Sequence, residues 1–161
     1  MKHGRIRKEF PYTTHSIEVP VRSAGYECRG LIDTGASLSY IPLCTAYRCG
    51  LLNGEIQFSG NIIRADSEVY RAVPCTAKLE ILQEKNEESV IEIDGFKMSV
   101  IITGRLTGET SPAESIRKRA SQEEREIDKA DELVLLGLDL LRCGGFSLSR
   151  HGQALVMTLE L

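Results

Sequence analysis

The chain has 161 residues, which is enough for one domain and leaves no room for a second of ordinary size. Its 42% hydrophobic and 27% charged residues are typical of a globular protein that buries a core, and unlike a disordered or collagen-like chain. Lys and Arg number 20 against 23 Asp and Glu, a net charge of -3. The composition therefore gives no electrostatic reason to expect nucleic-acid binding.

Membrane segments and targeting signals are not expected either. The apolar run 133–136 stops at Gly137, far short of the roughly 20 residues that span a bilayer. The N-terminus is basic, but Glu9 and Pro11 stand where the apolar part of a signal peptide would begin. We expect a cytoplasmic protein with no membrane contact.

The five cysteines show no C-x-x-C spacing, which argues against a disulfide framework. Cys44 and Cys49 would approach each other on a helix, but no His lies at ligand spacing from them. We expect buried, reduced thiols and no metal. The chain also lacks a phosphate-binding glycine loop, so we expect no cofactor.

The first half of the chain predicts strands and one helix. Residues 1–13 are basic and predict a disordered tail, so the domain is expected over 14–161. Alternating apolar residues predict strands over 15–22 and 26–32, joined by a turn. A short helix is expected over 42–52, and a hairpin projecting from the body over 56–73, with Ala65-Asp66-Ser67 at its centre.

The second half predicts more strands, interrupted by a charged insertion at about 104–132. A strand over 75–81 precedes a hairpin that turns at Asp94-Gly95, and a closing hairpin follows around His151-Gly152. The insertion predicts a helix over 112–130 that starts at a capping box. Its apolar stripe is thin, which fits either a mostly exposed helix or one that covers a substrate or partner; the stripe comprises Ala113, Ile116, Ala120, Ile127 and Ala130.

One short motif places a carboxylate directly after a buried strand. Asp33 follows the apolar strand end and precedes Thr34 and Gly35, a glycine that permits a sharp turn. Taken alone, this motif also fits an Asx-type turn with no chemistry. About a hundred residues later, Val134-Leu135-Leu136-Gly137 supplies a buried apolar run and a glycine, followed by a predicted helical turn over 138–142.

Together, Asp-Thr-Gly-Ala-Ser at 33–37 and Leu-Leu-Gly-x-Asp-x-Leu at 135–141 resemble the retropepsin-like aspartic proteases, in particular their single-domain cellular members. The resemblance covers most of residues 15–160. It implies a mainly β fold, a closed, barrel-like acid protease lobe with one lobe per chain. A short helix is expected after Gly137, and the charged helix is an insertion in that fold.

The resemblance also implies the roles of individual residues. Asp33 corresponds to the catalytic carboxylate, and Thr34 to the hydroxyl that links two active-site loops. The other implied site residues are Gly35, Ala36 and Ser37 in the loop, Leu136 and Gly137 as the apolar wall behind it, and Ile63, Ala65, Asp66 and Ser67 in a substrate-binding flap at about 62–73.

Two features depart from the viral members of the family. They often carry Asp where this chain has Ser37, and Arg where it has Leu138, so the salt bridge between those residues is absent here. The flap also lacks their glycine-rich tip. These departures keep a second interpretation open, a non-catalytic dimerisation or peptide-binding module that retains the fold.

The chemistry itself demands a second subunit. Peptide hydrolysis by this route needs one ionised carboxylate and one protonated carboxyl, whereas the chain has one Asp-Thr-Gly. Asp94 is expected in a hairpin turn and Asp139 on a helical turn, so neither offers an equivalent site. The sequence therefore predicts a homodimeric aspartic endopeptidase that binds an extended peptide.

Overall fold

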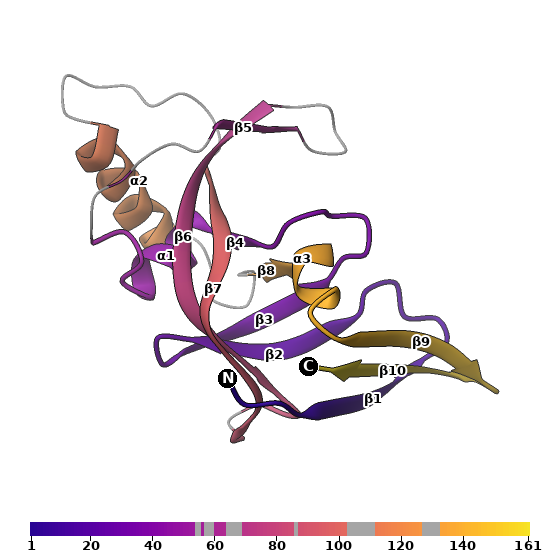
Figure 1. The fold of residues 1–161 in the computed structure, drawn as a ribbon. Helices are drawn as coiled ribbons and strands as arrows, with labels where there is room; N and C mark the ends of the chain where they lie inside the picture. The colour runs from indigo at the N-terminus through magenta and orange to yellow at the C-terminus, as the bar shows by residue number, and fades with distance from the viewer. Residues whose placement is uncertain (54–55, 57–59, 64–68, 86, 103–111, 127–132) are drawn as a thin grey trace.

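The computed structural model describes residues 1–53, 56, 60–63, 69–85, 87–102, 112–126 and 133–161, and strands dominate it (Figure 1). Its elements in chain order are β1 (Arg5–Pro11), β2 (Glu18–Ser23), β3 (Tyr26–Ile32), β4 (Tyr40–Pro42), α1 (Leu43–Arg48), β5 (Gly60–Ile63), β6 (Val69–Leu82), β7 (Ser89–Ile102), α2 (Pro112–Glu126), β8 (Leu133–Leu136), α3 (Leu138–Leu141), β9 (Gly145–His151) and β10 (Ala154–Glu160).

Six of these strands close into a barrel. They are hydrogen bonded in the order β2-β3-β8-β4-β7-β6, and β6 pairs back with β2 to complete the ring. Inward-facing apolar side chains from around the ring fill the core, among them the fully buried Ile41, Ile81, Ile91 and Leu136. The mainly β, closed-barrel fold expected from the sequence is confirmed, including the short helix after Gly137 and the helix in the charged insertion.

Residues 5–11 correct the expectation of a disordered tail over 1–13. They form β1, which pairs along its whole length with β10, from Arg5 opposite Glu160 to Pro11 opposite Ala154. Ile6 is fully buried and Phe10 packs against the core. Lys8 lies between Ile6 and Phe10 on the same face of the strand, so a basic residue interrupts the apolar period, and the basic composition concealed it.

The Asp94-Gly95 pair lies inside a strand and makes no hairpin turn, which is a second correction. β7 runs unbroken from Ser89 to Ile102, and the chain reverses before it, between β6 and β7. Ala77 pairs with Phe96 and Leu79 with Ile93, so two residues of β7 oppose one residue of β6. Gly95 has a φ of 66°, which a β-bulge accommodates as well as a tight turn does.

The helix α1 is shorter than the predicted range 42–52. α1 ends at Arg48, and Gly50 follows with a φ of 69°. α2 is described to Glu126, so Ile127 and Ala130 of the predicted stripe lie outside the described residues. Ile116 and Ala120 are fully buried, α2 packs against α1, and the Arg117 Nε donates to the Leu52 carbonyl at 2.8 Å. The thin stripe therefore anchors α2 to the barrel.

The sequence predicts buried thiols, and two of the five cysteines are buried. Cys44 and Cys49 are buried, Cys28 and Cys75 are half-buried, and Cys143 is exposed. Burial raises the pKa of the Cys28 thiol to about 12 and the pKa of Cys49 and of Cys75 to about 11. These three thiols are therefore protonated at neutral pH, which makes them poor nucleophiles.

No helix within the described residues is long and apolar enough to cross a membrane. The cytoplasmic location stays a prediction from the sequence.

Replacing Ile116 by Ala tests whether α2 belongs to the folded core. Because the side chain is fully buried, we expect the free energy of unfolding to fall by about 2 to 5 kcal/mol in urea denaturation. Lys118→Ala, at an exposed position of the same helix, is the control and should change it by less than about 0.5 kcal/mol. Equal, small effects of the two substitutions would show that the helix does not pack on the barrel.

Candidate active site

The position of β8 determines the path of the chain around Asp33. β8 pairs in parallel with β3, from Leu133 opposite Arg29 to Leu136 opposite Ile32. On its other side, β8 pairs antiparallel with β4, where Leu135 lies opposite Tyr40. β3 and β4 are consecutive strands, yet β8 lies between them. The loop 33–39 must therefore cross the end of β8 to connect them. Figure 1 shows this loop beside α3, the helix that follows β8.

Backbone hydrogen bonds hold Asp33 at the start of that loop. Its backbone N–H donates to the Leu136 carbonyl at 3.0 Å, which extends the pairing of β3 with β8 by one residue. Its side-chain Oδ1 accepts the Gly35 N–H at 2.8 Å, and its carbonyl accepts the Ala36 N–H at 3.3 Å. The Asx-type turn considered from the sequence is thus present. It fixes one carboxylate oxygen, while Oδ2 makes no hydrogen bond within the described residues.

Gly137 permits the close crossing of the loop over β8. A Cβ at this position would lie 2.5 Å from the Leu38 carbonyl oxygen and 2.9 Å from that of Ala36. Both distances are shorter than any side chain tolerates, and the obstacles are backbone atoms that cannot rotate away. The adjacent Leu138 N–H donates to the Ala36 carbonyl at 2.8 Å. Glycine is therefore required here for packing, at an ordinary negative φ.

A buried hydrogen-bond network ties the far end of the loop to α3. The Ser39 hydroxyl accepts the Gly137 N–H at 2.9 Å and donates to Asp139 Oδ1 at 2.6 Å. The Ser39 N–H donates to Asp139 Oδ2 at 2.9 Å. Asp139 thus uses both carboxylate oxygens within the protein, in contrast to Asp33. Charge-assisted hydrogen bonds of this kind are the stronger ones in proteins.

Sequence reasoning missed the roles of Ser39 and Asp139. Asp139 stood in the motif that carried the resemblance, but it was considered only as a second catalytic group. Ser39 is fully buried, and no local pattern separates it from the exposed Ser37 two residues earlier. Tyr40 follows, and its pKa is raised by burial and then by the nearby Asp139 carboxylate. One signal could have pointed to this contact: Asp139 stands at the start of a predicted helical turn, and a carboxylate there is expected to accept hydrogen bonds from nearby N–H or O–H groups.

The other predicted loop residues lie around Asp33. Thr34, Gly35 and Ser37 are exposed at the outside of the loop, and Ala36 is half-buried. Leu136 is fully buried beneath it. The loop and the β8 end that the sequence predicted to meet are therefore brought together.

The predicted flap is only partly described. β5 and the start of β6 pair antiparallel, from Gly60 opposite Ala72 to Ile63 opposite Val69, and they extend beyond the barrel in Figure 1. Ile63 is the last residue of β5. Ala65, Asp66 and Ser67 lie outside the described residues. Their assignment to the flap tip stays a prediction.

Among the residues that the structure describes, no group of three or more His, Cys, Asp or Glu side chains is placed to hold a metal ion. The groups of the loop that can act chemically are the Asp33 carboxylate and the hydroxyl and backbone groups around it.

Comparison with known proteins identifies the fold. No family model matches the chain, and no curated protein matches its sequence. It is similar in structure to a retropepsin-like aspartic protease from Rickettsia conorii, with a TM-score of 0.58 and 14% identity, over 99% of this chain and 96% of that one. The retroviral protease-like domain of Ddi1 from Leishmania major gives a TM-score of 0.49 and 16% identity, over 92% and 96% of the two chains. The chain has a retropepsin-like fold.

Replacing Ser39 by Ala tests the network that holds the loop. The change leaves the buried Gly137 N–H without its acceptor, so we expect the free energy of unfolding to fall by about 1 to 3 kcal/mol. Ser37→Ala, in the exposed part of the same loop, should change it by less than about 0.5 kcal/mol. Urea denaturation of both variants measures the difference, and a Ser39→Ala protein as stable as the wild type would refute the network.

Proposed function

We propose that this chain is an aspartic endopeptidase that acts as a homodimer. The observation that carries the proposal is the state of Asp33, a half-exposed carboxylate on a loop held at both ends, with one oxygen fixed and the other unbonded within the described residues. Asp139 in the same site, by contrast, engages both carboxylate oxygens in holding the loop. Asp33 is thus held in place and remains accessible to a substrate.

Two such carboxylates complete the reaction. The ionised one takes a proton from a water molecule, whose oxygen attacks the peptide carbonyl carbon. The protonated one donates its proton to the carbonyl oxygen, which gives a tetrahedral gem-diol. The carboxyl that took the proton from water then passes it to the amide nitrogen while the other carboxylate takes a proton from a gem-diol hydroxyl, so the C–N bond breaks to release an amine and a carboxylic acid and the pair again holds one proton. Two carboxylates at close range share one proton because ionising both is costly, as in the aspartic protease dyads that define the principle. A twofold axis that relates two copies of Asp33 supplies this pair.

The exposed part of the loop fits a role at such an axis. Thr34 and Gly35 lie outside the barrel in the single chain, where the partner's loop would meet them. The proposed substrate is an extended peptide bound between this loop and the β5–β6 hairpin. Extended peptides bind mainly through backbone hydrogen bonds, so the affinity would depend weakly on side chains. The retropepsin-like fold, shared with an aspartic protease from Rickettsia conorii, supports the proposal.

The substitution Asp33→Asn tests the catalytic role. It keeps the shape of the side chain and removes its acid-base function, so cleavage of an unfolded protein mixture should fall by about 100- to 10,000-fold. Asp94→Asn makes the same change at an exposed carboxylate in the β7 bulge and should leave the rate unchanged. Mass spectrometry of the products gives both rates. Cleavage by the Asp33→Asn protein at the wild-type rate would exclude the proposed mechanism.

Mixing wild type with Asp33→Asn tests whether two subunits share one site. If subunits exchange at equal amounts, only about a quarter of the dimers carry two Asp33, so activity should fall to about half of that of the wild-type subunits alone. Activity that stays proportional to the wild-type protein would mean that each subunit works by itself. If neither protein cleaves although both are folded dimers, the binding-module interpretation replaces the enzyme.

A further inference from the structure

Three of the five thiols gather where the end of α1 meets the barrel. Cys28 stands on β3, two positions before the buried Gly30 and therefore on the same inward face. Cys75 stands on β6, and both side chains pack against the core. Cys49 follows α1 directly and is 6% exposed. Burial raises the pKa of Cys28 and of Cys75, and the nearby Cys49 thiol raises both further.

Contacts with the β2–β3 hairpin hold Cys49 beside Cys28. The Cys49 thiol donates to the Ser23 carbonyl at 3.4 Å, and the Arg48 guanidinium donates to the Tyr26 hydroxyl at 3.1 Å. Ser23 lies opposite Tyr26 in the hairpin, so Cys28, at the next inward position of β3, is the diagonal neighbour of Ser23. Diagonal neighbours on one face of an antiparallel pair lie within about 8 Å of each other. Cys49 therefore contacts the residue next to Cys28.

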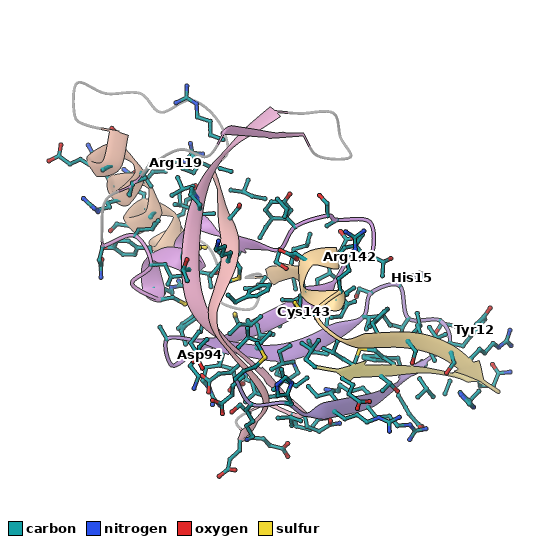
Figure 2. All side chains as sticks on the ribbon, in the orientation of Figure 1. Tyr12, His15, Asp94, Arg119, Arg142 and Cys143 are labelled. Atoms are coloured by element: carbon teal, nitrogen blue, oxygen red, sulfur yellow. The ribbon has the colours of Figure 1, made fainter. Side chains whose placement is uncertain are left out.

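Two other cysteines are less suitable partners for Cys49. The Cys75 sulfur accepts a hydrogen bond from the backbone N–H of Met98, its opposite residue on β7, which offsets part of the pKa rise that burial causes. Cys75 is therefore engaged with β7. Figure 2 shows Cys143 beside α3 and β9, away from α1. Cys28 is thus the thiol best placed to react with Cys49.

The hydroxyl of Ser23 adds a polar group to this apolar surrounding. It is buried and has no hydrogen-bond partner among the described residues. Burial raises the pKa of Cys49, and this hydroxyl offsets part of the rise. It can therefore donate to the Cys49 sulfur when that sulfur carries a negative charge.

The segment from Cys28 to Cys49 contains the whole candidate active-site loop. β3 leads from Cys28 to Asp33, and β4 and α1 lead from the loop to Cys49. A covalent bond between the two cysteines would close this segment into a ring. Such a bond stabilises a fold mainly by restricting the unfolded chain.

We propose that Cys28 and Cys49 form a disulfide under oxidising conditions, and that this bond braces the segment that carries Asp33. Both are free thiols in the structure, which is the reduced form. The inference goes beyond the proposed function, because the bond concerns the stability of the fold and forms whether or not the chain cleaves peptides.

Hydrogen peroxide is the oxidant of the proposed reaction. The half-buried Cys28 loses its proton, and its sulfur attacks one peroxide oxygen. The O–O bond breaks, the sulfur becomes a sulfenic acid, and the released hydroxide takes up the proton to give water. The Cys49 thiolate then attacks the Cys28 sulfur and expels hydroxide, which takes up the Cys49 proton as a second water. Two thiols thus lose two electrons, and one peroxide gains them.

The raised pKa values make the bond slow to form and slow to break. Attack requires the thiolate, which is scarce at neutral pH because burial raises the pKa of both thiols. Reduction must displace one of the same two sulfurs, and a thiol of high pKa is a slow leaving group. The bond therefore responds to a lasting change in redox conditions and persists after it.

Tryptic peptide mapping tests the pairing. Lys and Arg residues divide the sequence so that each of the five cysteines falls in a separate tryptic peptide: 23–29, 30–48, 49–64, 72–78 and 143–150. The folded protein is incubated with hydrogen peroxide, its remaining thiols are alkylated, and the digest is analysed by mass spectrometry without reduction. We expect peptide 23–29 linked to peptide 49–64. A folded protein that links other peptides, or none, would overturn the proposal.

Thermal unfolding tests whether the bond braces the fold. The oxidised wild type should unfold roughly 5 to 10 °C above its reduced form, and dithiothreitol should remove the rise. Cys49→Ser and Cys28→Ala should show no rise, whereas Cys75→Ser, the matched control from the same group, should keep it. Each variant is compared with its own reduced form, so a lower starting stability does not affect the result. A rise that persists in Cys49→Ser would contradict the brace.

The outcomes separate this inference from the proposed function. If the chain cleaves peptides but peptides 23–29 and 49–64 never link, the disulfide is wrong and the enzyme stands. If the two peptides link and the unfolding temperature rises in a chain that cleaves no peptide, the disulfide stands and the enzyme is wrong.

Discussion

The placement of β8 between β3 and β4 is the constraint on which the rest of the structure depends. Two strands adjacent in sequence are separated by a third strand from a hundred residues later in the chain. The loop that connects them must therefore cross the end of that third strand. The loop's carbonyl oxygens at Leu38 and Ala36 lie only 2.5 and 2.9 Å from the place that a Cβ on Gly137 would occupy. This crossing determines where Asp33 lies and how firmly it is held.

The two acidic residues of this crossing differ in their hydrogen bonds. Asp139, at the start of α3, uses both carboxylate oxygens on Ser39 and keeps the loop on β8. Asp33, at the other end of the loop, uses only Oδ1, on its own turn. Asp139 thus holds the loop, and in the proposed enzyme the second oxygen of Asp33 is the one left for chemistry. In that enzyme, fixing Asp33 before the substrate arrives would reduce the ordering that the reaction itself must provide.

Elements whose structure follows from a local sequence pattern could be predicted from the sequence. The strand before Asp33 and the strand before Gly137 were predicted at the residues where they occur, because their apolar runs end in a glycine-containing turn. β1 was missed because Lys8 interrupts the apolar face between Ile6 and Phe10, and the basic residues suggested a tail. Asp94-Gly95 was wrongly predicted to form a hairpin turn, because a β-bulge and a tight turn both accept a glycine with positive φ. Which of the two forms depends on the pairing with β6, which the local sequence does not show. The link from Ser39 to Asp139 joins residues a hundred positions apart, which no local pattern reveals.

In the proposed dimer, each chain carries half of an active site. The most direct test measures the cleavage rate per subunit and the sedimentation mass on the same dilution series of the wild-type protein. We expect both to fall together, so that cleavage disappears at the concentrations where the dimer dissociates. Cleavage at an undiminished rate per subunit by a chain that sediments as a monomer would contradict the shared site.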